Sequence, residues 1–272
     1  MSSETVDVLL RAPAWVLCLA FLAGLLLALE GGYRVGNHSR HREGSDIGPI
    51  QGAVLGLLGL LLAFTYSYAA TRADNRKQAV VEEANAIGTA YLRAGLMPEP
   101  GRDDLRNLLR AYTDLRIVTA QVSHDPARLL ANIAESEALH SQLWATAAKL
   151  LNARAPTPID GLMFQSLNEV IDMHGRRLAA GRDRLPGLIL ALLFIVAIVA
   201  LAVTGFTAGQ TGQRNGLLTV TLAVMLTAVT YIIIDLDHSR SGIIRVSQES
   251  LQDLQKSLRI DAVDNRPDAE KR

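Results

Sequence analysis

The apolar side chains of this chain gather into four long, largely uncharged blocks. The blocks run from Trp15 to Leu29, from Ile50 to Ala70, from Leu185 to Ala208 and from Leu217 to Leu236. Each block approaches or exceeds the ~20 residues that a helix needs to cross a hydrocarbon core about 30 Å thick. The pattern therefore predicts an all-α integral membrane protein with four transmembrane helices.

Between the second and third blocks, apolar residues recur at three- and four-residue steps, which is the period of amphipathic helices. Four helical segments are expected, at 73–96, 102–122, 126–151 and 159–184; "GLMPEPG" ends the first and "ARAPTP" ends the third. No stretch has the alternation typical of a strand. We expect these helices to form a bundle, and we expect the polar tail after Ile260 to be disordered.

The predicted organisation has four parts. They are transmembrane helices 1 and 2 in residues 1–70, a cytoplasmic helical domain in 71–184, transmembrane helices 3 and 4 in 185–236, and a cytoplasmic C-terminal helix with its disordered tail in 237–272.

Basic residues near the ends of the blocks set the expected orientation. One side of the membrane would carry Arg34, Arg40, Arg42 and Arg214, and the other would carry Arg11, Arg72, Arg76, Lys77, Arg176, Arg177, Arg182, Arg184, Arg240 and Arg245. Cytoplasmic segments are the ones enriched in Lys and Arg. We therefore expect a multi-pass protein of the inner (cell) membrane with the helical domain and both termini in the cytoplasm.

The second block carries small residues along one helical face. Gly52, Gly56, Gly59 and Ala63 follow at four- and three-residue spacing, and a separate face carries Leu57, Leu60 and Phe64. Small faces let membrane helices approach closely. In one interpretation the small face packs on helices of the same subunit and the large face meets lipid. In the other, copies of this helix surround an axis, the small face packs between subunits, and the large residues narrow a pore.

Several stretches resemble a known family. The stretch "FTYSYAATR" at 64–72 resembles the end of the pore-lining second helix of bestrophin channels. The chain as a whole resembles the bacterial bestrophin-like family called domain of unknown function 4239, through "EANAIGTAYLRAGLMPEP" from Glu83, "SLNEVIDMHGRR" from Ser166 and "DLDHSRSGIIRVSQESLQDL" from Asp235. The last stretch contains Asp235, Asp237, Arg240 and Gly242, which we take as family-motif residues.

This resemblance implies a homopentamer around a central ion pathway, in contact with membrane lipid and small inorganic ions. Leu60 and Phe64 match the hydrophobic neck of bestrophins, whereas Gly56 stands where that neck has a bulky apolar residue. Ala73 and Asp74 replace a tryptophan pair, and the C-terminal region has no acidic cluster resembling the calcium clasp. These departures argue against calcium gating.

Other chemistry is scarce in the sequence. The 27 acidic and 27 basic residues balance, so the net charge says nothing about partners. We expect no nucleic-acid partner, and Cys18 is the only cysteine. Neither "NHSRH" nor "DLDH" has the ligand set of a metal site, and no phosphate loop or nucleophile motif is present. We expect no enzyme activity, no cofactor and no metal. The first block can be extended across Glu30 to Gly36, and Glu30 then lies about three quarters of the way along it, where it either serves a functional site or reaches water.

Two functions remain open. The first is an oligomeric bestrophin-like ion channel whose second helix lines the pore and whose neck lies near Leu57, Leu60 and Phe64. The alternative is a membrane sensor or scaffold that conducts no ions, since helical bundles between two membrane helices also resemble bacterial ligand-sensing modules.

Overall fold

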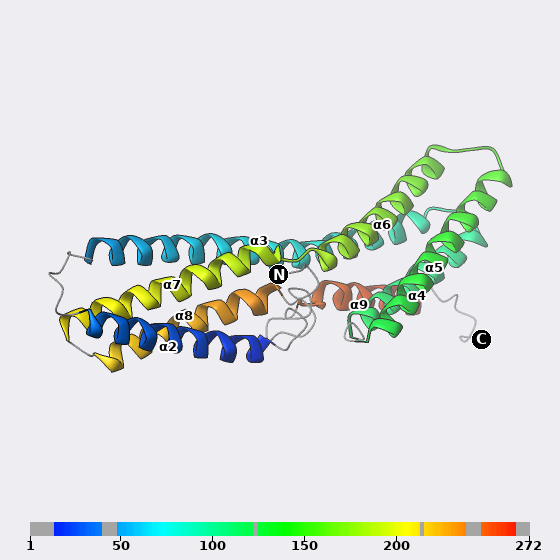
Figure 1. Ribbon diagram of the computed structural model, residues 1–272. Helices are drawn as coiled ribbons and strands as arrows, with labels where there is room; N and C mark the ends of the chain where they lie inside the picture. The colour runs from blue at the N-terminus through cyan, green and yellow to red at the C-terminus, as the bar shows by residue number, and fades with distance from the viewer. Residues whose placement is uncertain (1–13, 40–47, 122–124, 213–214, 238–245, 265–272) are drawn as a thin grey trace. The chain divides into compact units, whose positions relative to one another are not determined.

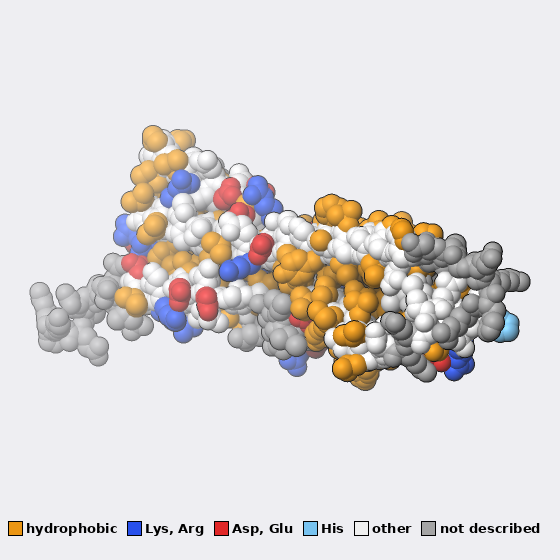
Figure 2. All heavy atoms as spheres, turned by 90° about the vertical axis from the view of Figure 1, so that its left-hand side faces the viewer, with side chains coloured by type: hydrophobic (Ala, Val, Ile, Leu, Met, Phe, Trp, Pro, Cys, Tyr) orange, Lys and Arg blue, Asp and Glu red, His pale blue; other side chains and the backbone are white. Residues whose placement is uncertain are grey.

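The computed structural model describes residues 14–39, 48–121, 125–212, 215–237 and 246–264, all of them helical or in connecting turns (Figure 1). Four of its helices are long and apolar enough to cross a membrane, as the hydrophobic blocks predict. The chain divides into two compact units. Unit 1 comprises residues 1–73 and 184–244, and unit 2 comprises residues 74–183 and 245–272. Hydrophobic side chains gather over one part of the surface, and charged ones over another (Figure 2).

Unit 1 contains α2 (Ala14–His38), the first part of α3 (Gly48–Ala94), α7 (Gly187–Thr211) and α8 (Gly216–Asp237). Within it, α2 packs most extensively on α7 and also contacts α8. Leu25, Leu193, Ala200, Leu201 and Ala223 lie in its apolar core.

Four glycines bring α2 and α7 into direct backbone contact. A Cβ atom added at Gly32 or Gly36 would overlap the carbonyl oxygen of Ala202 or Phe206, and one added at Gly205 or Gly209 would overlap that of Leu29 or Tyr33. Because each pair is spaced by four residues, the glycines line one face of their helix. Only residues without a side chain permit this approach, which provides van der Waals contact that lipid would not.

The part of α3 in unit 1 packs through a face other than its small stripe. Leu58, Thr65 and Ala69 are buried, and Thr65 Oγ1 donates to the Leu61 carbonyl at 2.7 Å. The apolar stretch ends near Ala70, and Arg72, Arg76 and Lys77 follow it. About 20 residues suffice for the crossing, so the charged second half of this long helix extends beyond the membrane.

Unit 2 contains the rest of α3 with α4 (Gly101–Gln121), α5 (Pro126–Asn152), α6 (Pro158–Arg182) and α9 (Glu249–Asp264). Here α4 packs against α5 and α9, and α5 also packs against α6. The apolar core includes Ile87, Leu109, Leu143, Val170 and Leu251. Each helix of the unit thus contributes to one core.

The helix ends follow ordinary capping chemistry. Asp125 accepts from the backbone N–H of Ala127 and Arg128 at the start of α5, and the Asp160 carboxylate accepts from the Thr157 N–H at 2.7 Å at the start of α6. Arg154 donates to Asp160 at 2.6 Å. The last helix, α9, continues to Asp264 rather than ending near Ile260; residues 265–272 of the expected tail lie outside the described residues.

Candidate functional site

The first candidate site is an exposed apolar face of α3 in unit 1. Leu57, Leu60 and Phe64 are 50%, 52% and 65% exposed, so nothing in the described part of this single chain covers them. A Cβ added at Gly52, Gly56 or Gly59 would meet nothing within 4 Å, and Ala63 is also exposed. Within the described part of the subunit, the small face therefore packs on no other helix. Both faces remain available to lipid or to another copy.

Two polar contacts lie near the ends of the crossings. Arg72 donates to the Tyr68 hydroxyl, and its guanidinium carbon lies 4.3 Å from the centre of the Tyr68 ring, a cation–π contact. The buried Asp237 carboxylate accepts from the backbone N–H of Leu185 at 2.7 Å. This gives the Leu185 N–H, just before α7 begins, a hydrogen-bond partner. Asp235 is buried as well, whereas Arg240 and Gly242 of the same motif lie outside the described residues.

The second candidate site is a buried polar group in unit 2, which we call the Glu83 cluster. Its members are Glu83 from α3, Tyr112 and Arg116 from α4, His140 from α5, and His174 and Arg177 from α6. Each helix supplies a side chain on the face that it turns to the core. The cluster therefore lies where these four helices meet.

Glu83 is the centre of the hydrogen bonds. Its Oε1 accepts from Arg116 Nε at 2.7 Å and from the Tyr112 hydroxyl at 3.0 Å, and its Oε2 accepts from Arg177. Arg177 also donates to Gln248 Oε1 at 2.8 Å. Burial alone would raise the pKa of Glu83, but the charges and hydrogen bonds of Arg116 and Arg177 outweigh it and hold that pKa below its ordinary value. Glu83 is therefore ionised, and the cluster carries one excess positive charge.

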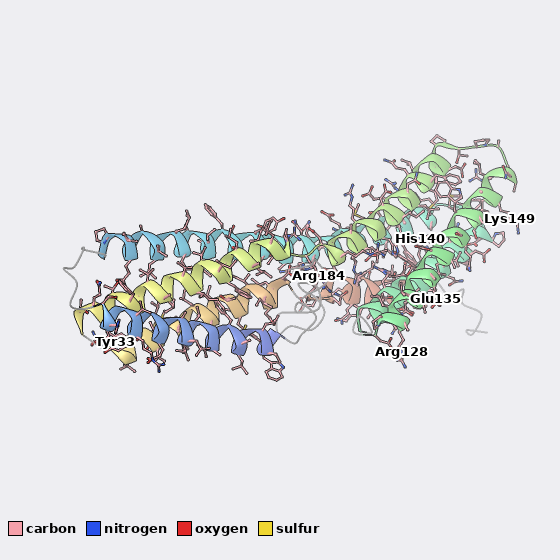
Figure 3. All side chains as sticks on the ribbon, in the orientation of Figure 1. Tyr33, Arg128, Glu135, His140, Lys149 and Arg184 are labelled. Carbon is pink, nitrogen blue, oxygen red and sulfur yellow. The ribbon has the colours of Figure 1, made fainter. Side chains whose placement is uncertain are left out.

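The two histidines lie against each other beside these cations. The rings of His140 and His174 meet edge to face with centroids 5.0 Å apart, and the His140 ring lies 4.8 Å from that of Tyr112. Figure 3 places His140 on α5. Burial, followed by the charge of Arg116, lowers the pKa of each histidine from 6.5 to about 4. Both are therefore neutral at pH 7.

The hydrogen bonds fix the tautomer of His174. Because the Tyr112 hydroxyl gives its proton to Glu83, its oxygen accepts from His174 Nδ1 at 3.3 Å. The proton is thus on Nδ1, and His174 Nε2 is the free nitrogen. That atom, His140 Nε2 and Arg116 Nη1 are buried, and none has a hydrogen-bond partner among the described side chains.

The Glu83 cluster was not predicted, although a signal for it existed. The three stretches that carry the family resemblance contribute Glu83, then His174 with Arg177, and then Gln248, and the fold joins them by direct hydrogen bonds. Tyr112, Arg116 and His140 lie in none of these stretches.

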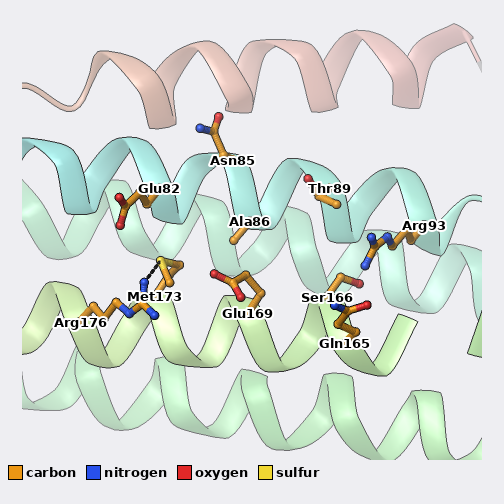
Figure 4. A pocket seen from close by; sticks show the side chains of 10 residues that line it. All are labelled: Glu82, Asn85, Ala86, Thr89, Arg93, Gln165, Ser166, Glu169, Met173 and Arg176. Carbon is orange, nitrogen blue, oxygen red and sulfur yellow. Dashed lines mark hydrogen bonds between the residues drawn. The ribbon is translucent and has the colours of Figure 1, made fainter. Parts of the chain in front are cut away.

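A groove of about 470 Å³ lies between α3 and α6 on the surface of unit 2 (Figure 4). Its charged side chains alternate in sign, with Glu82 and Arg93 on α3 and Glu169 and Arg176 on α6. Asn85, Thr89, Gln165 and Ser166 add neutral polar groups. The lining suits polar ligands carrying charges of both signs.

The other residues singled out in the sequence form no metal site in the part of the chain that the structure describes. Among the described side chains, no group of three His, Cys, Asp or Glu residues could hold a metal ion. Glu30 pairs with Arg34 one turn away at 2.9 Å, and Glu30 lines a small hollow of about 230 Å³ between α2, α7 and α8. Cys18 is buried and His38 is exposed, while His41 and His238 lie outside the described residues.

Several solved structures share this fold. A bacterial bestrophin homolog from Klebsiella pneumoniae, solved by Zn-SAD phasing, aligns with a TM-score of 0.66 at 14% identity, covering 90% of this chain and 98% of that chain. A variant of that homolog with one aspartate replaced by alanine aligns with a TM-score of 0.67 at 13% identity, with the same coverage of both chains. A further structure, described as a membrane protein, aligns with a TM-score of 0.67 at 14% identity, covering 92% of this chain and 99% of that chain. No curated protein sequence matches.

The helices and their apolar spans define a multi-pass, all-helical membrane protein with the fold of a bacterial bestrophin homolog. The model of the bestrophin-like domain matches residues 17–251, which is most of the chain, and the chain belongs to that family.

Proposed function

We propose that this protein is a homopentameric ion channel in which α3 from each subunit lines a central pore. The neck of the pore is formed by Leu57, Leu60 and Phe64, and small inorganic ions pass through it. Both termini and unit 2 lie in the cytoplasm of a cell whose inner membrane the protein spans. The excess of Arg and Lys beside unit 2 supports this orientation.

The observation that carries the proposal is the pair of uncovered faces on α3. A lone apolar face would suit lipid equally well, but lipid does not require the open glycines beside it. Gly52, Gly56 and Gly59 leave room for the backbone of a neighbouring helix, as small residues do at helix interfaces in membranes. Copies that pack through this stripe would bring their exposed leucines and phenylalanines toward a common axis. The shared fold with a bestrophin homolog supports the same arrangement.

Ion flux through reconstituted vesicles tests the proposal. A narrow ring of Leu60 and Phe64 offers no hydrogen bonds to a hydrated ion, so it can empty of water and block conduction. Leu60→Ser with Phe64→Ala should keep the neck wet and raise the flux. The matched control is Leu218→Ser with Met225→Ala on α8, two side chains that are 67% and 62% exposed; it should leave the flux unchanged. Flux equal to that of empty vesicles for every variant, with intact oligomers, would contradict the proposal.

The alternative is a membrane sensor or scaffold without ion conduction, and one observation favours it. The groove between α3 and α6 has the mixed charges expected of a site for polar ligands. A sensor of this kind should bind a ligand in the groove and show no flux even when the α3 neck is made polar. The vesicle experiment therefore separates the two functions.

A further inference from the structure

The way α5 is held in unit 2 does not depend on ion conduction and so lies beyond the proposed function. The buried residues of α5 are Ser136, His140, Leu143 and Ala147, a single seam at four- and three-residue spacing. His140 is the ionisable member of this seam and lies near its middle. Attachment of the helix therefore depends on a side chain whose charge can change.

The surroundings of His140 make a positive charge there unfavourable. His174 and Arg177 face it from α6, Tyr112 and Arg116 from α4, and Glu83 from α3. Glu83 is the sole carboxylate within the cluster, and both of its oxygens already accept from arginines. A protonated histidine would therefore be a third cation beside Arg116 and Arg177 with no free counter-charge.

We propose that the His140–His174 pair is an acid-sensitive latch that releases α5 from α4 and α6 when the two rings take up protons. Protonation of either ring gives the seam a buried, unpaired cation, and water becomes the better environment for it. Release of α5 exposes His140 directly and opens His174 to solvent. The two protons then bind together, which makes the latch cooperative.

The direction of the pH effect follows from linkage. The closed form holds the pKa of each histidine near 4, whereas a solvated histidine has its ordinary value of 6.5. The open form therefore binds more protons throughout the interval between these values. As the pH falls below 6.5, each histidine shifts the equilibrium toward the open form by up to about tenfold per pH unit, until the pH reaches about 4.

The chain contains its own reporter of this opening. Trp144 lies one turn after His140 on α5, and its ring meets that of Phe164 on α6 edge to face at 5.0 Å. Its side chain is 39% exposed in the closed form, so release of α5 should raise its access from that level. The sequence has two tryptophans, so Trp15→Phe leaves Trp144 as the sole emitter. The full chain in lipid nanodiscs is titrated from pH 7.5 to 4, and the access of acrylamide to Trp144 is measured at each pH. Collisional access is used because a nearby protonated histidine can quench the intensity without any movement.

If the latch opens in acid, the access of acrylamide to Trp144 should rise reversibly below pH 6.5, with a pH dependence that corresponds to the uptake of about two protons. Either His140→Gln or His174→Gln alone should reduce the number of protons taken up to about one. The variant that combines both substitutions should show no transition. Replacing the other four histidines, at 38, 41, 124 and 238, with Gln retains both His140 and His174 and should preserve the transition. The proposal is overturned if the Trp15→Phe protein that keeps both histidines shows no transition, or if the variant lacking the other four histidines loses it. It is also overturned if the variant with both His140→Gln and His174→Gln folds and still shows the transition.

Discussion

Arg116 donates from Nε to Oε1 of Glu83 across 2.7 Å, and both side chains are almost wholly removed from solvent. Tyr112 and Arg177 complete the hydrogen bonds of that carboxylate. An ion pair at this depth contributes little net stability when intact, because desolvation offsets the attraction. Removing one partner is different, since the remaining charges are left buried and uncompensated.

Glu83→Gln should therefore lower the free energy of unfolding by about 3–5 kcal/mol. The amide keeps the shape but leaves Arg116 and Arg177 without a counter-charge. Denaturant titration of the full chain in detergent, followed by Trp144 emission in the Trp15→Phe background, measures the change. Asp253→Asn breaks an exposed pair with Lys256 and should alter stability by no more than about 0.5 kcal/mol. Equal effects of the two substitutions would contradict the assignment of Glu83 as a buried charge.

Gly205→Ala should destabilise unit 1 by about 1–3 kcal/mol, because the added methyl group would overlap the Leu29 carbonyl and force α2 and α7 apart. Gly24→Ala is the matched control, since nothing lies within 4 Å of its Cβ position. That change should be neutral or mildly stabilising. Thermal unfolding of the two variants in the same detergent gives the comparison. A tolerated Gly205→Ala would show that the two helices do not meet so closely.

Gly56→Leu should weaken the oligomer that we propose, because the leucine would occupy the space left for a neighbouring α3. Native mass spectrometry of the detergent-solubilised protein measures the distribution of subunit numbers. Gly24→Leu places the same side chain at an open position of α2 and should leave the distribution unchanged. An oligomer that persists in Gly56→Leu would show that the stripe faces lipid.

The orientation of unit 2 can be tested by labelling in cells. In a Cys18→Ala background, Glu99→Cys places a thiol at an exposed position of unit 2, and Asn37→Cys places one at an exposed position at the end of α2. If unit 2 is cytoplasmic, a membrane-impermeant maleimide should label Asn37→Cys in intact cells and should label Glu99→Cys only after the membranes are broken. The reverse pattern would invert the proposed topology.

The spans could be predicted from the sequence because hydrophobicity over 20 residues is a local property. Helix contacts were harder to predict, as two sets of glycines show. Gly52, Gly56 and Gly59 form the more visible pattern, yet they meet nothing in the part of the subunit that the structure describes, whereas Gly32 and Gly205 meet the backbone of the opposite helix. Whether a small residue makes a contact depends on the positions of both helices. The pattern along one helix shows which face is small, but it does not show where the other helix lies.

The same reason applies to the Glu83 cluster. A glutamate in a helical segment is most often solvated, and the residues around Glu83 do not distinguish it from its neighbour Glu82, which is half-buried and lines the groove. Its burial depends on arginines 33 and 94 positions further along the chain. The resemblance to a family identified the stretches that contain Glu83 and Arg177, but only the fold shows that they bind each other.

The contribution of α9 to the core of unit 2 affects how the protein is made. Leu251 and Leu258 of this helix are buried against residues that precede α7 in the chain, and Tyr91 donates to Asp261 at 2.7 Å. The ribosome therefore completes both α7 and α8 before it supplies the helix that closes this core. At about 5–20 residues per second, the apolar surface that α9 covers stays open for several seconds while the membrane spans are inserted. During that interval the nascent chain is open to chaperones, and unit 2 matures only after translation has passed the fourth span.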